Sequence, residues 1–152
     1  STSFCFGDGT GTNCPCANNG GAGEGCANGG GAGATLLSTG SASVSIADFG
    51  LSASNLIGSQ PGLYFQGNNA INAGLGISFG DGLRCAGGGV IRLQVRFSDA
   101  NGNSSTNADL VTAGGVVPGD TKRYQIWYRD PLTSPCGTLF NLSNGVELTF
   151  SS

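Results

Sequence analysis

The sequence predicts an all-β fold, an antiparallel β-sandwich of Greek-key or jelly-roll type with a glycine-rich, disulfide-stapled N-terminal arm. Several short segments alternate apolar and polar residues, and clusters of Gly, Asn, Asp and Pro separate them. No window combines a helical apolar stripe with capping residues. Short strands separated by turns are typical of sandwiches and barrels. We therefore expect one domain, with the arm at residues 1–33 and the sandwich at residues 34–152.

The arm at residues 1–33 differs from the rest of the chain in composition. From Ala17 to Gly33, no aliphatic side chain is larger than that of alanine. Such a stretch has little to bury, and ordering its many glycines is entropically costly. Cys16 and Cys26 are the residues there that can tie it down, so we expect a stapled arm lying over the surface of the domain.

The segments that follow the arm supply the predicted strands. The clearest is residues 91–97, where Ile, Leu, Val and Phe alternate with Arg and Gln. An Asn144-Gly145 pair predicts a two-residue hairpin between the last two strands. Asp99–Asn103 is expected to turn the chain toward Leu110–Thr112. The predicted strands are residues 43–46, 63–66, 91–97, 124–129, 139–142 and 146–150.

The tetrapeptide Phe-Gly-Asp-Gly occurs at residues 6–9 and again at residues 79–82, with a cysteine near each copy. Two copies of four residues do not establish an internal repeat. We interpret both as tight corners, in which glycine adopts a positive φ and aspartate bonds to the backbone.

The composition limits the classes of function. The 152 residues include 6 basic and 9 acidic side chains, a net charge of −3, and charged residues make up only 10% of the chain. Scattered basic residues in an acidic chain argue against nucleic acid as a partner. No apolar run approaches the length of a membrane helix, so no membrane insertion is expected. Histidine is absent, which excludes Ser-His-Asp triads, Cys-His dyads and histidine-bound metals. Without histidine, a serine nucleophile lacks its usual base, and no other acid–base constellation is recognisable, so we predict that the protein is not an enzyme.

The even number of cysteines, in a weakly charged chain with a small predicted core, indicates disulfides formed in an oxidising compartment. We expect Cys85 to pair with Cys136 and the four N-terminal cysteines to pair among themselves. The alternative is a four-thiolate zinc site in the arm, although Cys14-Pro15-Cys16 does not fit the usual C-x₂₋₄-C spacing of zinc ligands. The cysteines are Cys5, Cys14, Cys16, Cys26, Cys85 and Cys136.

Five segments together resemble an uncharacterised secreted domain of environmental bacteria, especially planctomycete-like ones. They are FCFGDGTGTNCPC at 4–16, GC at 25–26, LYFQG at 63–67, FGDGLRC at 79–85 and YQIWYRDP at 124–131. The resemblance spans nearly the whole chain. It implies export, disulfide bonds and a location at the bacterial cell surface, and it transfers no activity and no site residue.

The best candidate binding surface is the side of the 124–129 strand that carries Gln125, Trp127 and Arg129. An exposed tryptophan beside amide and guanidinium donors can stack on a sugar ring and bond to its hydroxyls. The alternative is that Trp127 belongs to the core or packs beneath Arg129. Arg92 and Arg96 are expected on one face of the 91–97 strand, where they would clamp an acidic glycan or simply be solvated.

A calcium site is the one cofactor hypothesis that the sequence offers. Asp99, Asn101 and Asn103 have the D-x-N-x-N spacing of a calcium loop. The glycine expected after the third ligand is replaced by Ser104, and ordinary turn formation explains the same residues.

Two functions compete. The first is an extracellular structural or adhesive subunit that binds copies of itself, with Phe4 and Phe6 on an N-terminal strand that adds to a neighbour's sheet and builds a filament or surface layer. The second is a carbohydrate-binding module that uses the aromatic surface around Trp127. The composition of the whole chain favours the first, because weak charge repulsion lets copies pack closely.

Overall fold

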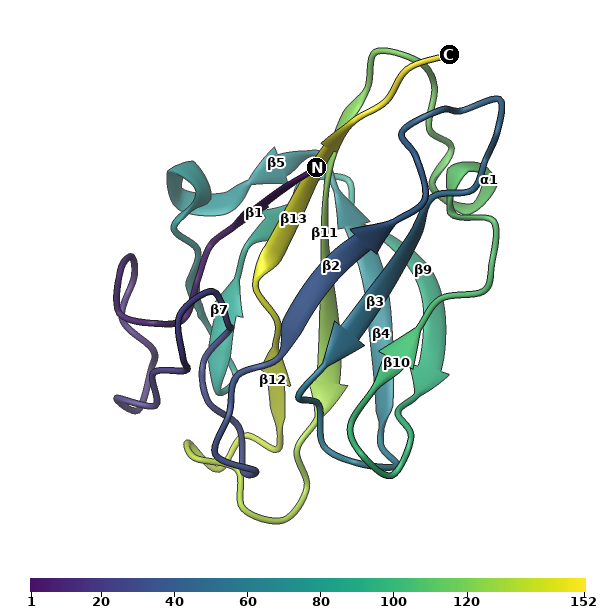
Figure 1. Ribbon diagram of the computed structural model, residues 1–152. Coiled ribbons are helices and arrows are strands. Elements are labelled where there is room, and N and C mark those ends of the chain that lie inside the picture. The colour runs from purple at the N-terminus through teal and green to yellow at the C-terminus, as the bar shows by residue number, and fades with distance from the viewer.

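Two antiparallel sheets face each other in the computed structural model, which describes residues 1–152 and confirms the all-β sandwich (Figure 1). The large sheet has the order β1-β13-β11-β4-β9, and β12 also pairs with β11. The small sheet, β10-β3-β2, covers one face of it, and the ribbons β5–β8 and β6–β7 are separate. The elements are β1 (Thr2–Phe4), β2 (Thr35–Thr39), β3 (Gly50–Ser54), β4 (Pro61–Gly67), β5 (Asn69–Ala70), the 3₁₀ turn η1 (Ile71–Gly74), β6 (Ile77–Phe79), β7 (Gly82–Arg84), β8 (Ala86–Gly87), β9 (Ile91–Phe97), β10 (Ser104–Ser105), α1 (Leu110–Gly114), β11 (Thr121–Arg129), β12 (Phe140–Leu142) and β13 (Gly145–Thr149).

The core lies between the two sheets. On the central strand β11, the predicted alternation points Tyr124, Ile126 and Tyr128 inward, where they meet Leu36 and Leu51 of the small sheet. All three tyrosines of the chain are buried there, and each hydroxyl has a side-chain hydrogen-bond partner. Burial without such a partner would be costly, so these bonds let a chain with few large aliphatics fill its core with tyrosine. The pairs are Tyr64 with Ser104, Tyr124 with Gln66, and Tyr128 with Asn28.

Two segments depart from the expected secondary structure. Residues 43–46 form a turn instead of a strand, because the Ser43 Oγ accepts the backbone N–H of Ile46 at 3.2 Å. Residues 110–114, which follow the 91–97 strand and its turn, form the short helix α1, which the apolar pattern did not indicate. Asp109 caps its first turn by accepting the Thr112 N–H at 3.1 Å, and Gly115 ends it with a φ of 60°.

The predicted Asn144-Gly145 hairpin is wrong. β12 and β13 do not pair with each other, because both pair with β11 and follow one another along the same side of it. The Asn144 side chain is buried and bridges the two sheets instead. Its Oδ1 accepts the Leu36 N–H at 2.8 Å and its Nδ2 donates to the Leu36 carbonyl at 3.2 Å. This asparagine therefore serves a contact between layers, which the local sequence does not reveal.

The 91–97 strand is confirmed as β9, but it is an edge strand with a bulge. The ladder with β4 skips Leu93, so the residues on its two sides point to opposite faces. Arg92 lies opposite Phe65 on the outer face of the large sheet, whereas Arg96 lies opposite Gly62 on the inner face. The expectation that both arginines share one face is therefore wrong.

Three disulfides connect all six cysteines, and none of them matches the expected Cys85–Cys136 bridge. Only Cys14–Cys26 lies within the arm, where the four N-terminal cysteines were expected to pair among themselves. Two bridges instead connect the arm to the body of the domain, because Cys85 and the loop at residues 130–139 lie next to the arm in the folded chain. The spacing of the cysteines in the sequence does not reveal this proximity. With every cysteine in a disulfide, no thiolate is left for the zinc alternative. The pairs are Cys5–Cys85, Cys14–Cys26 and Cys16–Cys136.

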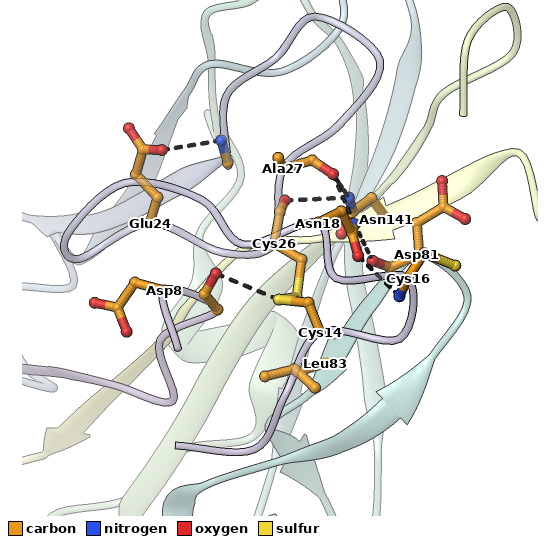
Figure 2. Close-up of a disulfide and its surroundings, with 12 residues drawn as sticks. Asp8, Cys14, Cys16, Asn18, Glu24, Cys26, Ala27, Asp81, Leu83 and Asn141 are labelled. Atoms are coloured by element: carbon orange, nitrogen blue, oxygen red, sulfur yellow. Dashed lines mark hydrogen bonds between the residues drawn. A yellow bond between two sulfur atoms is a disulfide. The ribbon is translucent and has the colours of Figure 1, made fainter. Parts of the chain in front are cut away.

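The arm is held by amide side chains as well as by sulfur (Figure 2). Asn18 donates to the carbonyls of Ala27 and Asp81, both at 2.8 Å, and Asn141 of β12 donates to the carbonyls of Cys26 and Ala27, both at 3.2 Å. The glycine-rich chain thus supplies backbone acceptors in place of the apolar side chains that it lacks.

The three disulfides indicate an oxidising, extracellular setting. None of the helices has the length and apolar character needed to cross a bilayer.

Candidate ligand-binding site

The outer face of the large sheet, which points away from the small sheet, carries a cluster of three aromatic rings. Trp127 projects from β11, Phe140 from β12 and Phe79 from the β6–β7 ribbon. The ring centroids are 5.4 Å apart for Phe79 and Trp127, 5.6 Å for Trp127 and Phe140, and 5.2 Å for Phe79 and Phe140, all in edge-on arrangements. Edge-on contacts are favourable for aromatic rings. The indole is therefore half-buried by its neighbours and held in a fixed orientation.

Two open pockets lie on either side of the indole. The larger has a volume of about 250 Å³ and the smaller about 180 Å³, and both are lined by Leu63, Arg92 and Trp127. We call the surface formed by these pockets and the aromatic cluster the tryptophan face. Its residues are Leu63, Phe79, Arg84, Val90, Arg92, Val95, Trp127, Arg129 and Phe140.

The tryptophan face carries positive charge without carboxylates. The chain contains two ion pairs, Lys122 with Asp120 and Arg123 with Glu147, and neither involves an arginine of this face. No acidic residue lines either pocket. Arg84 is positioned by two contacts: its guanidinium lies 5.7 Å from the centroid of the Phe79 ring, and its Nε donates to the Ala86 carbonyl at 3.4 Å.

The structure leaves open only part of the surface that was predicted from Gln125, Trp127 and Arg129. Trp127 and Arg129 lie on the open face, but Gln125 is 0% exposed beneath the β7–β8 segment. Its Oε1 accepts the N–H groups of Cys85 at 2.7 Å and Ala86 at 3.2 Å, and its Nε2 donates to the carbonyls of Leu83 at 3.0 Å and Ser143 at 2.7 Å. The β7–β8 segment covers Gln125 at one end of the face, so this side chain acts as a structural clamp between chain segments and is not open to a ligand.

The other predicted arginine and the assembly strand lie away from this surface. Arg96 points to the inner side of β9, near Tyr64. Phe4 is part of β1, which pairs with β13 of its own chain, and its ring packs against the buried disulfide cluster. Phe6 follows that strand and is partly buried. The structure therefore gathers Arg92, Trp127 and Arg129 and separates them from the remaining candidates.

The residues of the calcium hypothesis form a turn. The Asp99 Oδ1 accepts the backbone N–H groups of Asn101 and Asn103, both at 2.9 Å. This is the side-chain-to-backbone bonding by which aspartate stabilises a tight turn. No group of three acidic or cysteine side chains in the chain is placed to hold a metal ion. The geometry thus supports the turn interpretation of this segment.

Two buried carboxylates were missed by the sequence analysis. Asp81 accepts the Thr138 hydroxyl at 2.7 Å and also the Ser134 hydroxyl, and Asp130 accepts the Gly29 N–H at 2.7 Å. Burial raises the pKa of the Asp130 carboxyl above its ordinary value, although the Gly29 bond opposes the shift. These bonds fasten the loop at residues 130–139 to the β6–β7 turn and to the arm, so we assign both carboxylates a structural role. The run RDP at 129–131 gave no sign that its aspartate is buried.

Comparisons with protein-family models, with curated proteins and with solved structures find no match to this chain. The resemblance to secreted domains of planctomycete-like bacteria therefore stays a prediction.

Proposed function

We propose that the protein is a non-enzymatic extracellular adhesive subunit that binds a glycan through the tryptophan face. The observation that carries this proposal is the aromatic cluster beside two open pockets lined by arginines. The apolar side of a sugar ring packs well on an aromatic side chain. Guanidinium groups at the rim supply hydrogen bonds to the sugar's oxygen atoms. A few polar groups around an apolar platform are typical of ligand sites.

The scaffold beneath the face is rigid, which favours binding. Trp127 lies on β11, the strand paired with β4 on one side and with β12 and β13 on the other. The clamp formed by Gln125 fixes the same strand from above. A preorganised platform loses less conformational entropy when a ligand binds.

Assembly of copies by strand addition is less well supported by the geometry. β1 has three residues and is already paired along one side, so it offers a short edge. β9 is longer, and its Val95 and Phe97 are 59% and 69% exposed, but it carries a bulge at Leu93 and two arginines. Bulges, charges and short strands are the devices by which proteins prevent edge-to-edge pairing. Light scattering of the concentrated protein tests this: stable polymers would favour self-assembly over the proposed glycan-binding role.

Retention on insoluble polysaccharides tests the proposal. Trp127→Ala is expected to weaken retention about tenfold or more, because truncating a central aromatic residue has an effect of this size in other binding sites. Trp127→Leu, which keeps apolar volume beneath Phe79 and Phe140, provides a second variant if the alanine protein is unstable. The matched control is Leu37→Ala, which removes a 54% exposed side chain from the small sheet on the other side of the sandwich. Unchanged retention by folded Trp127 variants would refute the proposal.

A further inference from the structure

We infer that the ligand of the tryptophan face is an anionic polysaccharide, whose carboxylate or sulfate groups bind Arg84, Arg92 and Arg129. This inference rests on the proposed glycan-binding function and assigns its ligand class. It follows from where the few charges of the chain lie.

The basic residues of this acidic chain are unevenly distributed. The sequence has 6 of them and a net charge of −3. Lys122 and Arg123 are neutralised by ion pairs. Arg92 and Arg129 line the larger pocket, and Arg84 and Arg92 line the smaller one. Half of all the basic side chains therefore surround one indole, in a protein whose overall charge would repel anions.

The carboxylates of the chain are engaged elsewhere, so these arginines lack an internal counter-charge. Two carboxylates form hydrogen bonds within the arm, two are buried, three accept backbone N–H groups in turns or at the start of α1, and two belong to the ion pairs. Their partners are Thr10 for Asp8, Gly21 for Glu24, Ser41 for Asp48, Thr138 for Asp81, Asn101 for Asp99, Thr112 for Asp109, Val117 for Asp120, Gly29 for Asp130 and Arg123 for Glu147. An uncharged sugar would leave three guanidinium groups without an ionic partner.

The positions of the arginines suit a chain of acidic sugars. Arg92 borders both pockets, with Arg129 on one side of Trp127 and Arg84 on the other. A sugar stacked on the indole would therefore present acidic groups of its own and of its neighbours to guanidinium groups on both sides. Guanidinium forms paired, charge-assisted hydrogen bonds with carboxylate and sulfate-like anions. The Ala86 carbonyl and the Phe79 ring already orient Arg84 for this role.

Affinity electrophoresis in gels that contain defined polymers tests the inference. Polygalacturonate and dextran sulfate are the carboxylate and sulfate probes, and fully methyl-esterified polygalacturonate and dextran are their uncharged counterparts. We expect at least one anionic polymer to bind about tenfold more tightly than its uncharged counterpart, because charge-assisted bonds are roughly twice as strong as neutral ones. Raising the salt concentration is expected to weaken this binding through screening.

A matched pair of variants on one strand separates site-specific binding from general charge attraction. Arg92→Gln and Arg96→Gln remove the same charge from β9 but from opposite faces of the sheet. We expect Arg92→Gln to weaken anionic binding about fivefold or more and Arg96→Gln to change it less than twofold. Polyglutamate, an acidic polymer without sugar rings, is expected to bind weakly.

The outcomes distinguish the two proposals. Equal binding of charged and uncharged polysaccharides, with no effect of Arg92→Gln, would overturn this inference and leave glycan binding in place. Equal losses in Arg92→Gln and Arg96→Gln, or polyglutamate binding as tight as that of the anionic polysaccharides, would also overturn it. A failure of every polysaccharide to bind would refute both proposals.

Discussion

Gln125 provides the sharpest stability test, because one buried amide holds three parts of the chain together. The Gln125→Leu variant has a side chain of similar size but removes all four of its hydrogen bonds. Two backbone N–H groups and two carbonyls, from the β7–β8 segment and from the Ser143 segment, would lose their side-chain partner in a buried environment.

The expected loss of stability follows from these four groups. An unsatisfied buried polar group costs about 1–3 kcal/mol, and partial entry of water makes four such costs less than additive. We therefore expect a loss of about 3–6 kcal/mol in the free energy of unfolding. For a chain of 152 residues, about 1 kcal/mol shifts Tm by roughly 2–4 °C, so Tm should fall by about 6–24 °C. Thermal and urea unfolding, followed by circular dichroism with the disulfides intact, measure both quantities.

Gln94→Leu is the matched control for this experiment. Gln94 also links two segments through its amide, with bonds to the Asn107 side chain and to the N–H groups of Asn107 and Ala108, but most of these bonds face solvent. Water can replace them, so the loss should be about 1 kcal/mol or less. Equal losses in the two variants, or a Gln125→Leu protein as stable as the wild type, would refute the argument that burial gives the clamp its importance.

Three further perturbations have defined outcomes. The Cys16–Cys136 bridge includes an exposed cysteine, so it should be the first bridge to react with mild reductant, as followed by non-reducing mass spectrometry. Because the bridge closes a long loop, replacing both cysteines by serine should lower the free energy of unfolding by about 4 kcal/mol. Earlier reduction of another bridge would contradict the expected order. Asp130→Asn keeps an acceptor for the Gly29 N–H and removes a buried charge. Because a raised carboxyl pKa makes stability fall as pH rises from the ordinary aspartate pKa through the raised value, the variant should be at least as stable as wild type at pH 7 and lose this advantage in acid; a marked loss at pH 7 would be evidence against it. Gly80 has a φ of 58°, and an added Cβ would lie 2.2 Å from the Phe140 ring, so Gly80→Ala should cost about 1–3 kcal/mol and alter the fluorescence of the aromatic cluster, whereas a neutral change would argue against this contact.

Strand positions were predicted well where alternation alone decides them. β11 shows this most clearly, because its two faces meet different layers and Ile126 and Trp127 point to opposite sides as expected. Whether each side of a strand is buried or exposed was less predictable. Gln125 is polar and lies on the outward side of β11, so its burial depends on a ribbon formed by residues far away in the sequence.

The arrangement of the arginines depended on a partner strand. The alternation of residues 91–97 is regular, yet the bulge at Leu93 is a property of the ladder with β4 and leaves no mark in the sequence of β9 itself. As a consequence, Arg92 lies on the tryptophan face and Arg96 lies on the inner side.

The two Phe-Gly-Asp-Gly segments show that identical local sequence can take different roles. Asp8 follows the expected turn chemistry by accepting the Thr10 N–H at 3.1 Å, and bonding to the Thr10 hydroxyl lowers its pKa. Asp81 is instead buried and bonds to Thr138 in a distant loop. Tertiary packing decides between these roles, as it also decides the disulfide pairing.

The fluorescence of Trp127 during titration with an acidic polysaccharide tests the central claim most directly, because the chain has a single tryptophan and every change in emission reports on the proposed site. Ligand stacked on the indole should shift the emission to shorter wavelength, protect it from iodide quenching and saturate with the binding curve measured independently. Saturable binding with unchanged emission and unchanged quenching would place the ligand elsewhere and contradict the account.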